Sequence, residues 1–75
     1  MTTDIKVLFG KRLRKLRRMR DWTQEEMAEK CGMSSDFISQ LERGKNSPSL
    51  DTLQKLAEVL EVPIAEFFTQ PDAGK

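Results

Sequence analysis

Gln24–Arg43 reads QEEMAEKCGMSSDFISQLER and decides the fold, because its small and apolar residues have the spacing that two crossed helices require. The residues at inward helical positions are Met27, Ala28, Cys31, Ile38 and Leu41. Gly32 lies where a first helix can end in a left-handed conformation. Ser34 lies where its side-chain oxygen can cap a second helix. These features predict a helix-turn-helix over residues 24–43.

A long helix is predicted before this motif, over about residues 5–20. Its apolar residues recur every three or four positions and form one stripe at Ile5, Phe9, Leu13 and Leu16. Thr23 and Glu26 then have the spacing of a capping box, so the next helix begins at Gln24. Trp22 can pack on Met27 across the start of that helix.

Two shorter helices are predicted after the motif, whose second helix ends at Gly44. Ser49 can cap a fourth helix with inward residues at Leu50, Leu53, Leu56, Ala57 and Leu60. Val62-Pro63 can begin a short fifth helix, because proline is best tolerated in a first turn. We therefore expect an all-α domain of five helices over residues 5–69, with unstructured ends at residues 1–4 and 70–75.

Composition limits the chemistry available to the chain. It has 75 residues, one cysteine and no histidine, which excludes an intrachain disulfide and a cysteine-based zinc site. There is no apolar run near the length of about twenty residues that crosses a bilayer, and no signal-peptide pattern. The sequence also lacks a nucleophile motif and room for an enclosed substrate cavity. We expect a cytoplasmic protein that is not an enzyme, with no cofactor, metal or membrane partner.

The net charge of +1 conceals a strong asymmetry along the chain. Residues 1–20 carry eight basic side chains and one acidic, whereas residues 21–75 carry five basic and eleven acidic. The local field steers a protein towards phosphate more than its total charge does. Two interpretations stay open for the basic segment: a solvated helix face, or a surface that raises non-specific affinity for DNA.

The chain resembles the helix-turn-helix family of phage repressors and Cro proteins, whose members are often called XRE-type regulators. The resemblance extends from about Phe9 to about Phe68. The matching residues are Phe9-Gly10, Leu13, Leu16-Arg17, Thr23-Gln24, Met27-Ala28, Gly32-Met33, Ile38, Leu41-Glu42-Arg43-Gly44, Pro48-Ser49-Leu50 and Leu53. It implies a compact, lambda-repressor-like domain of five helices that binds DNA in the major groove, usually as a dimer.

In such a domain the third helix lies in the major groove with its first turns nearest the base edges. The candidate base contacts are Ser35, Asp36, Phe37, Ser39 and Gln40. Gln40 can bond adenine N6 and N7 together. Asp36 can accept from cytosine N4, or it can stabilise the positive end of its own helix. Phe37 can touch a thymine methyl, or it can pack against neighbouring helices.

Phosphate contacts are expected on both sides of the third helix. The resemblance places them at Thr23, Gln24, Ser34, Arg43, Lys45, Asn46 and Ser47. The start of the second helix also favours an anion, because its backbone N–H groups and its dipole are positive there. The alternative for residues 45–47 is an ordinary polar loop. Contacts of this kind fix the register of a protein on DNA and carry little sequence information.

Other residues are expected to have structural roles, the first of them by the same resemblance. An ion pair is expected between Arg17 and Glu42, tying the first helix to the end of the third. The fifth helix carries more apolar residues than it can bury, which indicates a dimer interface. Those interface residues are Val62, Ile64, Phe67 and Phe68. Cys31 is expected to be a small buried hydrophobe rather than a redox switch.

We therefore expect a sequence-specific regulator of transcription. It would bind a pseudo-palindromic site in double-stranded DNA as a homodimer, and both a repressor and a restriction-modification controller fit this description. The alternative is an antitoxin or another protein-interaction module built on the same fold. The sequence indicates no small-molecule ligand.

Overall fold

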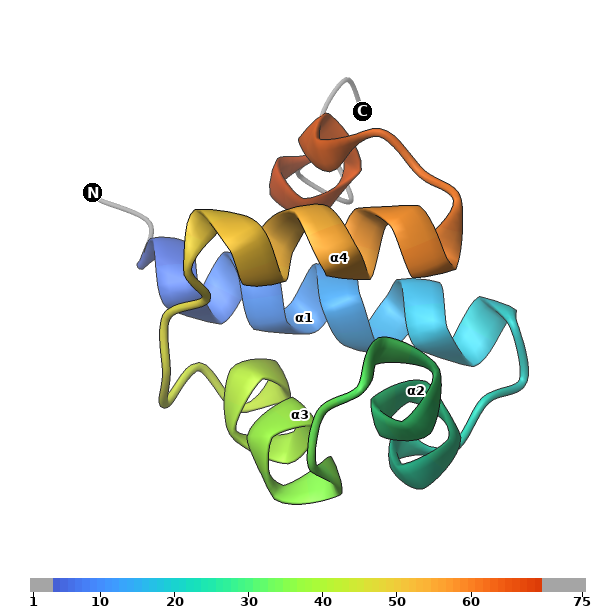
Figure 1. Cartoon of the computed structure of the whole chain (residues 1–75). Coiled ribbons are helices and arrows are strands. Elements are labelled where there is room, and N and C mark those ends of the chain that lie inside the picture. Colours follow the sequence, from blue (N-terminus) through green and yellow to red (C-terminus); the bar gives the residue numbers. More distant parts are fainter. Residues whose placement is uncertain (1–3, 70–75) are drawn as a thin grey trace.

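The computed structural model describes residues 4–69, which form four α-helices and a final 3-10 helix (Figure 1). The elements are α1 (Ile5–Met19), α2 (Gln24–Cys31), α3 (Ser35–Glu42), α4 (Leu50–Leu60) and η1 (Ile64–Phe68). The all-helical prediction is confirmed for these residues. The predicted ends at residues 1–3 and 70–75 lie outside the described part, whereas Asp4, which we expected in the unstructured end, is the N-cap of α1.

The fifth element corrects the expectation of five α-helices. Pro63 is the N-cap residue of η1 and makes no side-chain capping bond. The Glu66 N–H donates to the Pro63 carbonyl over 3.0 Å, which is the three-residue bond of a 3-10 turn. A five-residue segment without a cap has too few α-helical bonds to favour the wider helix, so the tighter turn forms instead.

The helices are arranged around α1, which crosses the middle of the molecule (Figure 1). In that view α2 and α3 lie below α1, α4 lies above α1 and partly in front of it, and η1 lies above α4. The most extensive contacts join α3 to both α1 and α2, and they join η1 to α1. The helix-turn-helix formed by α2 and α3 is therefore supported by α1 from one side. No helix within residues 4–69 is long and apolar enough to span a membrane.

The predicted caps are all present. The Thr23 hydroxyl accepts from the Glu26 N–H over 3.0 Å, and the Glu26 carboxylate accepts from the Thr23 N–H over 2.8 Å. Ser34 and Ser49 cap α3 and α4 in the same way, each accepting over 3.1 Å from the N–H three residues later. Gly32 ends α2 with a φ of 69°, in the left-handed region. Local sequence chemistry therefore fixes the ends of the motif.

The core contains most of the predicted apolar residues, with two exceptions. Fully buried members include Leu13, Met27, Ile38, Leu41, Leu56 and Leu60. Ile5 and Leu50, predicted to be inward, are 59% and 83% exposed. Each is the first residue of its helix, where the helix axis extends past the packed centre. Spacing alone assigned these residues to the correct stripe but could not show where the core ends.

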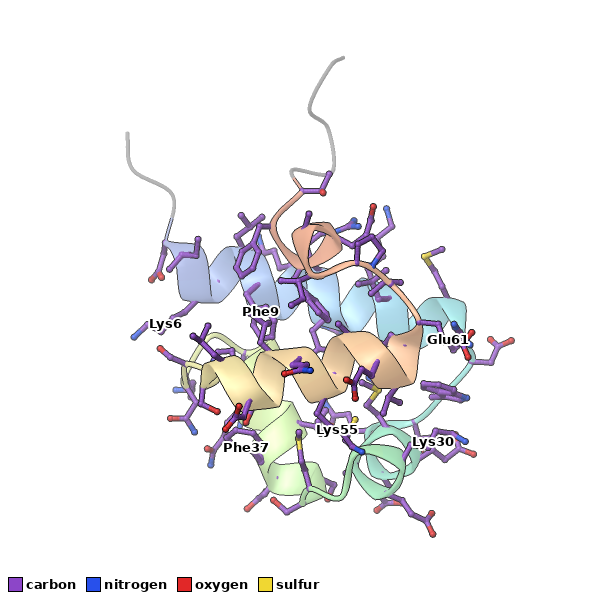
Figure 2. The ribbon with its side chains drawn as sticks, turned by 45° about the horizontal axis from the view of Figure 1, so that its top comes forward. Lys6, Phe9, Lys30, Phe37, Lys55 and Glu61 are labelled. Atoms are coloured by element: carbon purple, nitrogen blue, oxygen red, sulfur yellow. The ribbon has the colours of Figure 1, made fainter. Side chains whose placement is uncertain are left out.

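Asp21 and Trp22 form the turn between α1 and α2. Asp21 adopts a φ of 61°, a left-handed conformation that aspartate tolerates better than most residues. Trp22 is half-buried against the core, and the charged ends of Arg20 and Lys30 lie 5.5 and 4.9 Å from its ring centroid. Lys30 is labelled in Figure 2.

Gly10 lets α1 approach the end of α3 unusually closely. A Cβ atom at this position would lie 2.6 Å from the Glu42 carbonyl oxygen and closer still to that of Leu41. Both neighbours are backbone atoms, which cannot move aside as the end of a flexible side chain can. The absence of a side chain at Gly10 is therefore a condition for the packing of α1 on α3.

A buried network joins α1, α2 and α3. The Arg17 guanidinium donates to both Glu42 carboxylate oxygens, from Nε over 2.6 Å and from Nη2 over 3.0 Å. Arg17 Nη1 also donates to the Trp22 carbonyl over 2.6 Å, and Gln24 Nε2 donates to Glu42 Oε1 over 3.1 Å. Both charged side chains are almost completely buried. The ion pair expected between α1 and α3 therefore extends to the start of α2.

Gly10→Ala should destabilise the domain, although alanine is the better helix former by about 1 kcal/mol. The new methyl group would overlap the α3 carbonyls, and overpacking of this kind costs about 1–3 kcal/mol net. Denaturant unfolding measures the difference. Lys11→Ala, one residue along the exposed side of α1, is the control and should change the free energy of unfolding by less than about 0.5 kcal/mol. A Gly10→Ala variant as stable as its parent would contradict the close approach.

Glu42→Ala should lower the free energy of unfolding by about 3–5 kcal/mol, because it leaves the Arg17 charge buried without its partner. Glu29→Ala removes an exposed carboxylate from α2 and is the matched control, with an expected change below about 0.5 kcal/mol. Thermal melts followed by circular dichroism compare the two variants. Equal melting temperatures would rule out a structural role for the ion pair.

Candidate nucleic-acid interface

The outward face of α3 is polar. Asp36, Gln40 and Arg43 are spaced by four and three residues, so they share one face of the helix. Ile38 and Leu41, on the opposite face, are completely buried. The helix is therefore anchored by one side and presents the other at the surface, where Asp36 and Arg43 are exposed and Gln40 is half-buried.

Three further candidate base contacts lie beside this face. Ser35 and Ser39 are half-buried at its edge. Phe37 is also half-buried, and its ring packs against the hydrophobic core (Figure 2). Packing was one of the two roles expected for Phe37, and the structure supplies it. A contact from Phe37 to a thymine methyl stays a prediction for the part of the ring that remains accessible.

The loop after α3 folds back onto the helix. Gly44 has a φ of 73°, which turns the chain, and the Lys45 N–H then donates to the Gln40 carbonyl over 2.9 Å. The Asn46 side-chain amide donates to Gln40 Oε1. We expected Asn46 among the phosphate contacts, and its contact with a candidate base-reading residue was not foreseen. The two residues are six positions apart, outside the helical spacings that sequence inspection uses.

The start of α2 forms one rim of the face. Thr23 is exposed, but its hydroxyl already accepts the capping bond from Glu26. Gln24 is half-buried and its Nε2 donates to Glu42. Both residues lie where phosphate contacts were expected, and the side chain of each already makes one hydrogen bond within the protein.

The other rim follows α3. Arg43, Lys45 and Ser47 are exposed there, and Asn46 is half-buried. Ser34 is exposed at the beginning of α3, where its hydroxyl accepts from the Phe37 N–H. The predicted phosphate contacts thus lie on both sides of the polar face of α3, as the helix-turn-helix arrangement requires. Contact with phosphate stays a prediction.

The basic residues of α1 and its C-cap, Arg20, divide into two groups. Arg12, Arg17 and Arg20 form ion pairs with Glu66, Glu42 and Glu61. The remaining basic residues of α1 are exposed, and they are Lys6, Lys11, Arg14, Lys15 and Arg18. The first group therefore has structural contacts, and the exposure of the second group fits both interpretations, a solvated helix face and a surface that raises non-specific affinity for DNA.

Arg12 was missed by the sequence analysis. Its Nη2 donates to Glu66 Oε1 over 2.9 Å and its Nε donates to the Glu66 carbonyl over 2.8 Å, which fixes η1 on α1. Its position three residues after Phe9 and four before Leu16, at the edge of the core stripe, is a signal that could have indicated burial.

The predicted dimer interface needs one correction. Phe67 is completely buried, and its ring centroid lies 5.2 Å from that of Phe9 in the core. It is therefore unavailable to a second chain. Ile64 and Phe68 are 44% and 37% exposed, and Val62 is half-buried. The first two remain candidates for a contact between chains.

An apolar groove adjoins Phe68. It has a volume of about 240 Å³, and its apolar walls include Ile5, Leu50, Leu53 and Phe68. Ile5 and Leu50, which were predicted to be inward but are exposed, thus lie with Phe68 along one groove. The exposed apolar surface extends from η1 to the beginnings of α1 and α4.

The single cysteine is structural. Cys31 is buried, and burial raises the pKa of its thiol above the usual range, so the thiol stays protonated at neutral pH. This agrees with the expectation of a small buried hydrophobe. Among residues 4–69, no three histidine, cysteine or carboxylate side chains are grouped so that they could hold a metal ion.

Comparison with known proteins places the chain among helix-turn-helix proteins. A family model described as helix-turn-helix matches residues 13–67. The uncharacterized HTH-type transcriptional regulator y4dJ of Sinorhizobium fredii is 39% identical over 69 residues, covering 92% of this chain and 90% of that protein. The transcriptional regulator PuuR of Escherichia coli is 40% identical over 63 residues, which cover 84% of this chain but only 34% of PuuR.

A solved structure agrees with this placement. The restriction-modification controller protein C.AhdI from Aeromonas hydrophila has a TM-score of 0.81 and 36% sequence identity, with 84% of this chain and 91% of that chain covered. The chain belongs to the XRE-type helix-turn-helix family of DNA-binding transcription regulators.

Proposed function

We propose that this protein regulates transcription by binding a specific, pseudo-palindromic site in double-stranded DNA as a homodimer. The outward face of α3 is the main support, because a short helix buried on one side and polar on the other can enter the major groove. Asp36, Gln40 and Arg43 lie along that face. The second support is that the chain belongs to a family of DNA-binding regulators.

The base contacts would come from the first turns of α3. Gln40 can donate or accept in the groove, and Asp36 can accept from cytosine N4. Ser35 and Ser39 can contact either kind of base edge from the sides of the helix. Phe37 would contribute only the part of its ring that the core leaves accessible.

The phosphate contacts would come from the two rims. Arg43 and Lys45 carry positive charge after α3, and Ser34, Asn46 and Ser47 supply polar groups around them. Thr23 and Gln24 begin α2, where the helix dipole favours an anion. These contacts would set the orientation of α3 on the duplex and make binding sensitive to salt.

Dimerisation would use the exposed apolar surface around η1. Ile64 and Phe68 are its members from the predicted interface, with Val62 partly accessible beside them, and the groove at Ile5 and Leu50 continues it. A two-fold dimer would place two α3 helices about 34–36 Å apart, one turn of the double helix. The site would then be pseudo-palindromic. A repressor and a restriction-modification controller, the class to which C.AhdI belongs, both fit this description.

Gln40→Ala and Arg43→Ala should weaken DNA binding in different ways. Loss of a base contact should cost about 1–3 kcal/mol at the preferred site and relax the preference at one base position. Loss of a phosphate contact should weaken binding to all sequences alike and reduce the slope of log K against log salt by about 1. Selection from random duplexes, followed by footprinting and salt titrations, measures both effects.

The unmodified protein is the reference for this experiment. It should select a motif of two related half-sites about 10 base pairs apart. Salt-sensitive binding without a preferred sequence would contradict specific regulation. Equal loss of preference in Gln40→Ala and Arg43→Ala would contradict the division between base and phosphate contacts.

Ile64→Gln should weaken the dimer about tenfold or more, because burial of an isoleucine side chain is worth about 1.5–3 kcal/mol. Met19→Gln is the matched control. Met19 is also an exposed apolar residue, but it lies at the C-terminal end of α1, whereas the apolar groove lies at the N-terminal end. Sedimentation equilibrium with and without DNA measures the monomer–dimer constant. A parent protein that is monomeric under both conditions would contradict the dimer.

A further inference from the structure

The side-chain amide of Gln40 has two different ends. Its Oε1 accepts hydrogen bonds and its Nε2 donates them, so the orientation of the amide decides which base edges it can contact. In the structure Oε1 is turned towards the loop, where it accepts from the Asn46 side-chain amide. Nε2 is then the end that remains for the groove.

Asn46 is well placed to hold this orientation. The left-handed Gly44 reverses the chain after α3, and the bond from the Lys45 N–H to the Gln40 carbonyl brings the loop against the helix. Both Gln40 and Asn46 are half-buried, so their contact is partly shielded from competing water. The backbone thus positions one amide beside the other independently of DNA.

The orientation changes what Gln40 is expected to bind. A bidentate contact with adenine uses Oε1 as an acceptor and Nε2 as a donor together. With one lone pair of Oε1 engaged by Asn46 and the oxygen turned towards the loop, the bidentate adenine contact is weakened, and the NH₂ group is the end left fully free to donate. Guanine suits this group best among the bases, because its N7 and O6 are neighbouring acceptors in the major groove.

We propose that Asn46 is a positioning residue that turns the Nε2 group of Gln40 towards the major groove and so selects guanine at one position of the site. The inference rests on the proposed DNA-binding function. It gives Asn46 a part in sequence selection, in contrast to the phosphate contact that the family resemblance implies.

Asn46→Asp tests the proposal directly. A carboxylate only accepts, so Gln40 must reverse its amide to donate to it, and Oε1 then faces the groove. The preferred base should change from guanine to one with a donor, cytosine or adenine, with a shift in relative affinity of at least about fivefold. Ser47→Asp adds the same charge one residue later and is the matched control. It should lower affinity for all sequences and leave the preference unchanged.

Asn46→Ala provides a second variant, because it removes the partner without adding charge. The amide of Gln40 can then turn either way, and discrimination at that one base position should fall at least about fivefold while the other positions keep theirs. Selection from random duplexes with each variant measures the preference at every position. Circular dichroism melts verify that each variant is folded.

NMR of the DNA-free protein tests the contact separately from the DNA-binding function. The Nε2 protons of Gln40 should exchange rapidly with water in the parent and be protected in Asn46→Asp, where they donate to the carboxylate. Unchanged exchange in Asn46→Asp would overturn the proposal whether or not the protein selects a DNA site. Protected protons together with a preference that matches Ser47→Asp would also overturn it, and would leave Asn46 as a phosphate contact only. Failure of the parent to select any motif would instead reject the proposed function.

Discussion

The buried contact between Arg17 and Glu42 is the constraint on which the rest of the structure depends. Its two charges come from α1 and from the last turn of α3, and the two side chains are only 9% and 3% exposed. Such a pair contributes little net stability, because removing both charges from water offsets their attraction. It does make alternative packings costly, since any shift of α1 against α3 would leave a buried charge without a partner. The pair therefore specifies one arrangement of the helices, and Gly10 allows the backbones to approach closely enough to form it.

The same network connects the core to both ends of the candidate interface. Gln24 begins α2 and donates to Glu42, and the turn before α2 is held through the Trp22 carbonyl by Arg17. The residue after Glu42 is Arg43, on the exposed face of α3. The start of α2 and the end of α3, which carry the two rims, are thus fixed to one carboxylate. Their separation is set by the protein before any DNA is present.

Local features of this fold could be predicted from the sequence, and long-range features could not. The caps at Thr23, Ser34 and Ser49 and the left-handed Gly32 depend on residues within four positions of each other, so the sequence contains the whole interaction. The burial of Phe67 and the pair between Arg12 and Glu66 depend on how η1 meets α1, across 54 residues in the second case. The position of Asp36 and Gln40 on an exposed face followed from helical spacing. The contact of Gln40 with Asn46 did not, because it requires the chain reversal at Gly44.

Family resemblance identifies positions, whereas the internal partner of each side chain determines what that position can do. Five residues expected to contact DNA already have one polar group satisfied within the protein: Thr23, Gln24, Ser34, Gln40 and Asn46. A side chain held in this way has fewer rotamers to lose when it binds, which lowers the entropic cost of forming the interface. The polar group of the side chain that makes the internal bond is correspondingly less available to a base or a phosphate. Under the proposed function, specificity would therefore be set by pairs of residues, in which one member faces the DNA and the other decides which of its atoms does so.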